Sequence, residues 1–241
     1  MTPLFAVIPP ELLAVLGIGA AVIFAFGFVA LLSKFYRKAG PEEAIVRAGW
    51  GGLKAVSGEG IIVAPFIHMA ERMDLSVKRI EIHRRGDAGL VCKDNIRADI
   101  EVAFFVRVNN TKEDILMVAQ SLGCRRASER SELIQLFDAK FSEGLKTVGK
   151  HFDFVELYEE RDRFKEQILK VIGTDLNGYV LDDCAIDFLE QTALEMHNMH
   201  NILDAQGIKK ITELTAKEHI LANDITREKQ KVIKKQDVEA R

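Results

Sequence analysis

The residues with the clearest potential for chemistry are a small group of histidines and a carboxylate near the end of the chain. Glu195, His197 and His200 lie within six residues, and the two histidines are three positions apart. On a helix this spacing puts both imidazoles on one face, where they could ligate a metal ion such as zinc. No second cluster offers a third or fourth ligand at a convincing spacing. We therefore expect these residues to form no metal site.

Three aspartates make a second candidate, because neighbouring carboxylates can act as acid and base. They are Asp182, Asp183 and Asp187, in a segment (179–188) that reads as a strand. On a strand Asp183 and Asp187 fall on the face opposite the apolar residues, so solvated positions are expected. The chain also has no GxSxG, HExxH, P-loop or GxGxxG motif. We predict a protein that is not an enzyme, with no catalytic residues, no cofactor and no metal.

The three cysteines, Cys92, Cys124 and Cys184, are far apart and include no CxxC pair. An odd, scattered set argues against a disulfide framework and for a reducing compartment. We expect each thiol to behave as a small buried hydrophobe. The formal net charge of −3 gives no indication of nucleic-acid binding.

The element that must position everything else is an uncharged run over residues 12–33, LLAVLGIGAAVIFAFGFVALLS. As a helix with a rise of about 1.5 Å per residue, it would span roughly 33 Å, close to the hydrocarbon thickness of about 30 Å. We predict a single transmembrane helix. A cleaved secretory signal is the rival interpretation, but it needs a positive n-region and a shorter apolar run. Gly17, Gly19 and Gly27 would be points of close approach if several spans come together.

The flanks of this run predict its orientation. Glu11 is the only charged side chain before the run, whereas Lys34, Arg37 and Lys38 follow it closely. Lys and Arg beside a span stay preferentially on the cytoplasmic side. We expect residues 1–11 to form a short extracytoplasmic N-terminus and the rest of the chain to be cytoplasmic, in a cell (inner) membrane.

The segment 34–189 is predicted to be an α+β domain. Residues 34–109 are rich in strand patterns, at 44–48, 53–57, 77–83, 89–92 and, most clearly, 97–108, where apolar and charged residues alternate. The charged face of this last strand would suit repeated contacts with a neighbouring molecule. Residues 110–189 are rich in helix patterns and end with the strand 179–188. A capping box is expected at Asn110 or Thr111 and another at Asp153, and a helix stop is expected at Asn177-Gly178. We expect helices packed on an antiparallel sheet.

Residues 190–241 read as one long charged helix with a narrow apolar stripe. The stripe contains Ile208, Ile211, Leu214, Leu221 and Ile225. A stripe this narrow is typical of a coiled coil rather than of a core helix. The pattern reaches Arg241 with no stop signal, as expected of a fragment of a longer protein.

Five stretches, taken in order, resemble the bacterial flotillins of the SPFH (band 7) superfamily, which also includes stomatins, prohibitins and HflK/C. They are EEAIVRAGWGG (42–52), GEGIIVAPFIH (58–68), CKDNIRADIEVAFFVRV (92–108), FLEQT (188–192) and DAQGIKKITEL (204–214). The resemblance covers the chain from about residue 10. It departs at the C-terminus, where flotillins continue into a longer Ala/Glu-rich helix.

The resemblance implies a membrane-anchored scaffold that forms a large homo-oligomer, binds membrane lipid and organises membrane microdomains. It also implies a possible NfeD-type membrane partner. Two alternatives remain open at this point. One is a regulatory subunit of a membrane AAA protease, as HflK/C and prohibitins are, and the other is a membrane-anchored hydrolase that uses His197, His200 or Cys92.

Overall fold

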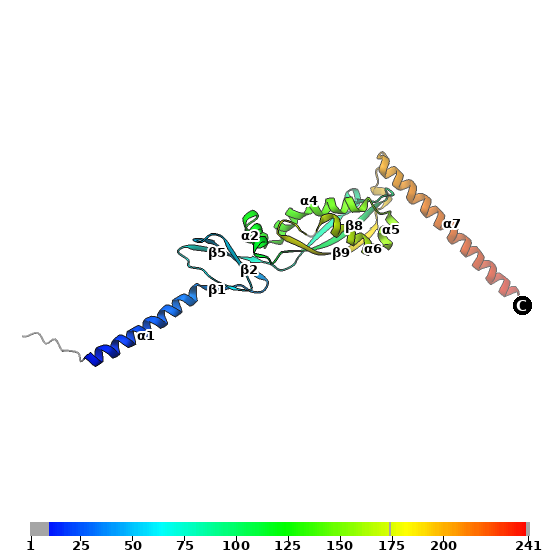
Figure 1. Ribbon diagram of the computed structural model, residues 1–241. Coiled ribbons are helices and arrows are strands. Elements are labelled where there is room, and N and C mark those ends of the chain that lie inside the picture. Colours follow the sequence, from blue (N-terminus) through cyan, green and yellow to red (C-terminus); the bar gives the residue numbers. More distant parts are fainter. Residues whose placement is uncertain (1–9, 174, 240–241) are drawn as a thin grey trace, which may run out of the picture. The chain divides into compact units, whose positions relative to one another are not determined.

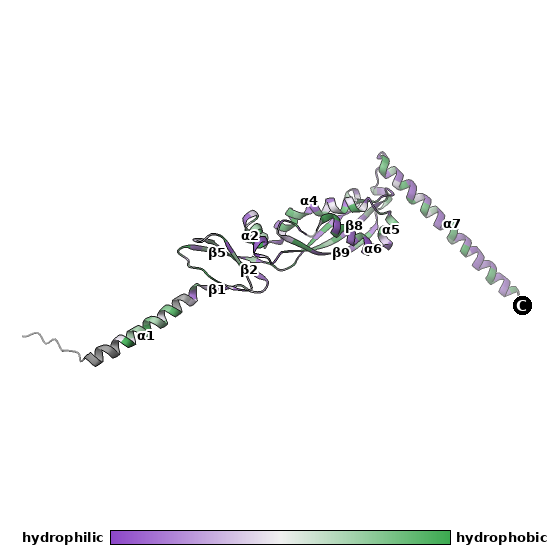
Figure 2. Ribbon diagram, in the orientation of Figure 1, coloured by the Kyte–Doolittle hydropathy of each residue, from purple (hydrophilic) through white to green (hydrophobic). Residues whose placement is uncertain are grey.

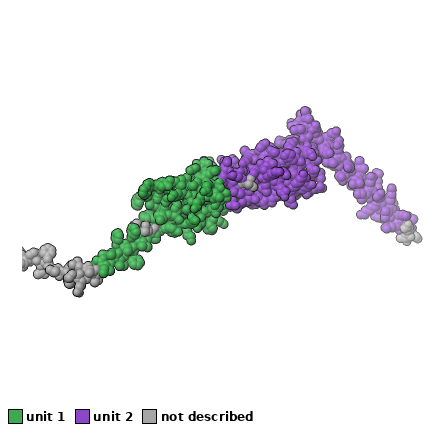
Figure 3. Space-filling model, in the orientation of Figure 1, with its two compact units in different colours: residues 1–76, 108–128 green, residues 77–107, 129–241 purple. Residues whose placement is uncertain are grey.

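The structure is a computed structural model that describes residues 10–173 and 175–239 (Figure 1). The chain forms two compact units, shown in two colours in Figure 3. Unit 1 contains the described residues up to Ser76 together with Val108–Ser128, and unit 2 contains Val77–Arg107 and the residues from Glu129 onward. Each unit combines strands with helices, so the predicted α+β class is confirmed. The units do not coincide with the strand-rich (34–109) and helix-rich (110–189) halves.

The N-terminal element is α1 (Pro10–Phe35), a 26-residue helix that contains the whole uncharged run. Its segment Gly17–Phe35 is long and apolar enough to cross a membrane, and none of it is buried against other described residues. In Figure 2 the described residues of α1 are coloured mostly as hydrophobic. The predicted extracytoplasmic segment 1–11 lies almost entirely outside the described residues.

Unit 1 is built around a three-stranded antiparallel sheet in the order β3-β2-β5. A separate pair, β1 and β4, is also antiparallel, and Tyr36 of β1 lies opposite Ile62 of β4. The core beneath these strands contains Ala39, Ile45, Ile61 and Val63. The elements of unit 1 after α1 are β1 (Tyr36–Lys38), β2 (Glu43–Gly49), β3 (Lys54–Ser57), β4 (Gly60–Ile62), β5 (His68–Asp74), α2 (Lys112–Ser121) and α3 (Cys124–Ala127).

Unit 2 is organised on β8 (Arg97–Val108), which has the bounds predicted from its alternating pattern. It pairs with β6 and β7 in one antiparallel sheet and also with β9. Phe104 of β8 stacks on Phe141 of α4 in the core, with ring centroids 4.3 Å apart. The other elements are β6 (Lys78–Arg84), η1 (Gly86–Ala88), β7 (Leu90–Val91), α4 (Arg130–Gly149), α5 (Phe154–Glu159), α6 (Arg161–Ile172), β9 (Tyr179–Gln191), η2 (Leu194–Met196) and α7 (Ile202–Glu239).

The predicted helix signals are mostly confirmed, with one error of placement. The Thr111 hydroxyl caps α2 by accepting a hydrogen bond from the Asp114 N–H, and Asp153 and Glu156 form the predicted capping box of α5. The stop at Asn177-Gly178 is wrong, because α6 already ends at Ile172 with Gly173 at positive φ. Asn177 and Gly178, also at positive φ, instead make the turn that leads into β9.

The long C-terminal helix is confirmed, but its predicted start at residue 190 is wrong. Strand β9 continues to Gln191, and the Thr192 N–H donates to the carbonyl of Arg97 at 2.9 Å, so pairing with β8 holds this segment extended. The turn of η2 follows, and α7 begins at Ile202.

Candidate membrane and self-association sites

The histidine and glutamate group does not converge on a common point. His197 is buried and its Nδ1 lies 3.0 Å from the carbonyl oxygen of Ala193, whereas Glu195 and His200 are exposed. Among the described residues, no group of three or more His, Cys, Asp or Glu side chains is placed to hold a metal ion. His197 is therefore a core histidine bound to the backbone.

The three candidate aspartates are separated into three ion pairs. Asp182 accepts from Arg107 at 2.8 Å and Asp187 from Arg79 at 2.5 Å. Asp183 accepts from the Lys165 ammonium at 2.7 Å, and this hydrogen bond lowers the pKa of Asp183. Each carboxylate is partly exposed and has its own cation, so the arrangement is that of surface pairs rather than of a paired acid and base.

All three cysteines are buried and free of disulfides, which confirms that they act as small core residues. Burial raises the pKa of Cys92 to about 12 and the pKa values of Cys124 and Cys184 to about 11. A nucleophilic cysteine needs a lowered pKa, because the thiolate is the reactive form. The pKa values of these three thiols are raised instead, so the thiols are not suited to act as nucleophiles.

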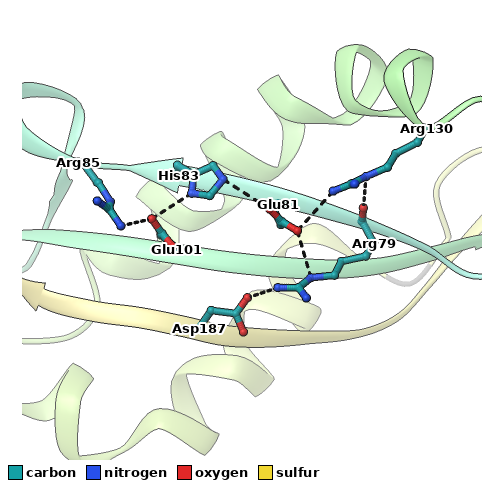
Figure 4. A network of polar contacts seen from close by, with 7 residues as sticks. All are labelled: Arg79, Glu81, His83, Arg85, Glu101, Arg130 and Asp187. Atoms are coloured by element: carbon teal, nitrogen blue, oxygen red, sulfur yellow. Dashed lines mark hydrogen bonds and ion pairs between the residues drawn. The ribbon is translucent and has the colours of Figure 1, made fainter.

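The charged face of β8 was expected to meet a neighbouring molecule, but its charged side chains have partners within the chain. Arg97, Glu101 and Arg107 form ion pairs, and Asp99 accepts a hydrogen bond from the Thr192 hydroxyl. Figure 4 shows the central part of this network, on β6, β8, β9 and the start of α4. Glu101 lies between His83 and Arg85, and it has a lowered pKa because His83 and Arg85 donate to it. Glu81 Oε1 forms ion pairs with Arg79 Nε and Arg130 Nη2, each at 3.3 Å. The face therefore offers no set of unpaired charges to a second molecule.

Beyond α1, an exposed apolar group of unit 1 lies at the end of the β2–β5 pair. It consists of Trp50, Phe66, Ile67 and Met69, here called the apolar tip. Trp50 and Phe66 are 80% and 91% exposed. The two loops that carry them are joined, because the Trp50 N–H donates to the Ile67 carbonyl at 3.2 Å. Exposed aromatic rings on adjoining loops are typical of a surface that enters a membrane interface or contacts another protein.

The backbone of the apolar tip is held by His68 and by glycine. The Ala64 N–H donates to Nδ1 of His68, and Nε2 of the same ring lies 3.0 Å from the Trp50 carbonyl, so the imidazole joins the two loops. Gly49 has a φ of 135°, and a Cβ there would overlap the Ile67 carbonyl oxygen. The predicted turn at 49–52 is confirmed, and it serves to present Trp50.

The apolar tip also lies close to the end of α1 along the backbone. The Val63 N–H donates to the carbonyl of Phe35, the last residue of α1, at 2.8 Å, and Val63 is also the first residue of the loop that carries Phe66. The sequence predicted a turn at Gly49-Trp50-Gly51-Gly52 but not this surface. Its signal was the presence of large apolar residues inside loops marked by Gly and Pro.

The second exposed apolar group is a stripe on α7. Ile211, Leu214, Leu221, Ile225 and Val232, here called the α7 seam, recur at spacings of 3, 7, 4 and 7 residues. These are the a and d positions of a heptad repeat, with Glu218 and Glu228 at the two intervening a and d positions. Only Ile211 is buried, and the other four are exposed between charged residues (Figure 2).

The first turns of α7 are fixed to β8 by a buried ion pair. Arg97 Nη2 lies 2.6 Å from Asp204 Oδ1, with side chains only 12% and 5% exposed. The other Asp204 oxygen accepts from the Asn198 N–H at 3.0 Å. Burial would raise the pKa of Asp204, but the hydrogen bonds from Arg97 and Asn198 outweigh it and the pKa is lowered.

Comparison with known proteins identifies the family. Residues 37–235 match the model of the SPFH domain / Band 7 family. The chain belongs to this family. It is 31% identical over 225 residues to the flotillin family inner membrane protein YqiK of Escherichia coli (strain K12), with 92% of this chain and 40% of that protein covered. It is 26% identical over 199 residues to the flotillin family inner membrane protein sll1021 of Synechocystis sp. (strain ATCC 27184 / PCC 6803 / Kazusa), with 80% and 29% covered.

The family membership and α1 agree on a membrane-associated, flotillin-like role. Both relatives are named as inner membrane proteins. The chain spans well under half the length of these two flotillin-family relatives, so what the longer proteins do as a whole is not transferred to it directly. In this SPFH protein the candidate functional surfaces are α1, the apolar tip and the α7 seam.

Proposed function

We propose that this protein is a membrane-anchored scaffold that associates with copies of itself through the α7 seam. The α7 seam carries the proposal, because four of its five apolar side chains are exposed at heptad spacing. A narrow apolar stripe on a charged helix is stabilised when it packs against like helices. The internal pairing of the β8 charges supports the same assignment, because it leaves that face without a set of unpaired charges for a second molecule.

The test compares two double variants of the full chain in detergent. Leu221→Glu with Ile225→Glu puts two charges into the seam, whereas Ala216→Glu with Asn223→Glu puts two charges on the exposed opposite side of α7. We expect the unmodified chain and the second variant to form assemblies of the same mass by light scattering, and the seam variant to be monomeric. Monomers in all three samples, or equal assemblies in all three, would contradict the proposal.

We further propose that α1 crosses the inner membrane with its N-terminus outside, and that the apolar tip enters the cytoplasmic leaflet. The positive residues that follow α1 support this orientation. Aromatic rings of roughly 150–250 Å² each gain free energy at the interface between headgroups and acyl chains. A membrane-bound assembly of this kind would organise the lipids and proteins around it.

The apolar tip can be tested directly, because Trp50 is the single tryptophan of the chain. In vesicles that contain brominated lipid, we expect quenching of its fluorescence, together with protection from iodide. The control is Trp50→Phe with Tyr158→Trp, which moves the fluorophore to an exposed position of α5 in unit 2. Iodide quenching of Trp50 as strong as that of the control would show that the apolar tip remains in water.

A further inference from the structure

Unit 1 contains an open cavity of about 540 Å³ with an apolar floor and a basic rim. Its floor includes Ala55, Val56, Ile61 and Leu116, and its rim carries Arg47, Lys54 and Lys112. A volume of this size is in the usual range for small-molecule sites, roughly 300–1,000 Å³. Apart from Ile61, which also packs in the core of unit 1, none of these residues was assigned a role above.

Arg47 is the strongest sign of a ligand in this cavity. Its Nη1 donates to the Ile62 carbonyl at 2.9 Å, but its Nε is buried and has no hydrogen-bond partner in the described part of the chain. A buried donor without a partner is costly, so it calls for an acceptor that is not part of the protein. A guanidinium presents several N–H groups in a fixed fork, which matches the oxygens of a phosphate.

The remaining charges leave the rim positive. Within the described residues, no carboxylate lies at ion-pair distance from Arg47 or Lys54. Lys112 lies 3.9 Å from Glu59, and both side chains are well exposed, so this pair is weak. Three cations facing one carboxylate favour an anion in the cavity.

The position of the cavity along the chain favours a lipid over a soluble anion. One wall is Gly60–Ile62, the strand that pairs with β1, and Tyr36 opposite Ile62 is the first residue after α1. Paired strands are about 4.8 Å apart. If α1 spans the membrane, this wall therefore lies at headgroup depth. An apolar floor beneath a cationic rim fits a molecule that is charged at one end and apolar at the other.

We propose that this cavity binds the headgroup and upper acyl segment of an anionic phospholipid. The proposal rests on the proposed placement of unit 1 at the membrane surface. Arg47 and the two lysines would bind the phosphate, and the floor would contact the start of the acyl chains. The site would give the scaffold a preference for anionic lipid.

The experiment measures lipid binding to the full chain in detergent by native mass spectrometry. The probes are phosphatidylglycerol, phosphatidylethanolamine and free glycerophosphoglycerol. The variant is Lys54→Gln with Lys112→Gln, and the control is Lys170→Gln with Lys210→Gln, which removes two equally exposed charges from unit 2. Since one Lys near a membrane surface is worth about fivefold in binding, we expect roughly 25-fold weaker phosphatidylglycerol binding in the variant and little change in the control.

Three results would overturn the proposal. They are equal loss in variant and control, equal binding of the two phospholipids by the unmodified chain, and binding of free glycerophosphoglycerol as tight as that of the intact lipid. The last would point to a soluble anion. Light scattering on the same samples tests the scaffold proposal independently of the lipid proposal. A chain that never assembles can still show the lipid preference of the cavity, and a variant that assembles can lose this lipid preference.

Discussion

The buried ion pair at the start of α7 allows a quantitative test of how the helix is held. Asp204→Asn keeps the size of the side chain but removes its charge, which leaves Arg97 buried without a counter-ion. Removing one partner of a buried pair typically costs about 3–5 kcal/mol. A loss of about 3 kcal/mol corresponds to roughly 150-fold faster local opening, since about 1.4 kcal/mol is a factor of ten. We expect hydrogen exchange of the amides over residues 202–211 to increase by this factor in the full chain.

The control lies on the same helix. Lys209 and Glu213 form an exposed pair at 3.7 Å, and exposed pairs of this spacing contribute only about 0.2–0.5 kcal/mol. Glu213→Gln should therefore accelerate exchange by about twofold or less. Arg97→Gln should match Asp204→Asn, and combining the two should add little, because both remove the same interaction. Equal effects of Asp204→Asn and Glu213→Gln would refute the argument from burial.

Three further predictions follow from the same contacts. The pKa of Asp204 is lowered in the folded chain, so the stabilisation from this carboxylate is present above the unfolded pKa of about 3.9 and is lost as pH falls through the folded pKa. Hydrogen exchange at the start of α7, corrected for the intrinsic rate, should therefore rise on acidification. The rise should be smaller in Asp204→Asn. Gly49→Ala forces a side chain into a positive-φ position and onto the Ile67 carbonyl, so unit 1 should lose about 1–3 kcal/mol in denaturant unfolding, whereas Gly52→Ala, whose Cβ meets no atom within 4 Å, should cost less. Burial raises the pKa of Cys92 to about 12, and the other two thiols are also buried. All three thiols should react slowly with a thiol reagent at pH 8 and rapidly after denaturation. Fast labelling of the native chain would contradict their burial.

Strands with a strict pattern could be predicted from the sequence, and strands formed by tertiary pairing could not. The bounds of β8 follow from its alternation, because one face of the strand is fully buried. Strand β5 was not predicted, since its sequence HMAERMD places only Met73 in the core. Its extended form comes from pairing with β2 along its whole length. Edge strands of this kind carry little hydrophobic periodicity.

The same limit explains which parts of the candidate sites were found. The 49–52 turn is encoded locally by its glycines, but the exposure of Trp50 depends on where the core lies, which no local pattern reports. The charges of β8 were visible in the sequence as a polar face. Their partners were not, because Arg107 pairs with Asp182 and Arg97 with Asp204, far along the chain.

The surfaces proposed for lipid contact and for self-association belong to different units of the chain. The apolar tip and the basic cavity belong to unit 1, whereas the α7 seam and the ion pair of Arg97 with Asp204 belong to unit 2. We therefore expect the cavity variant Lys54→Gln with Lys112→Gln to change lipid preference without changing assembly mass, and the seam variant Leu221→Glu with Ile225→Glu to do the reverse. A change in both properties from either variant would mean that lipid binding and self-association are coupled by the assembly itself.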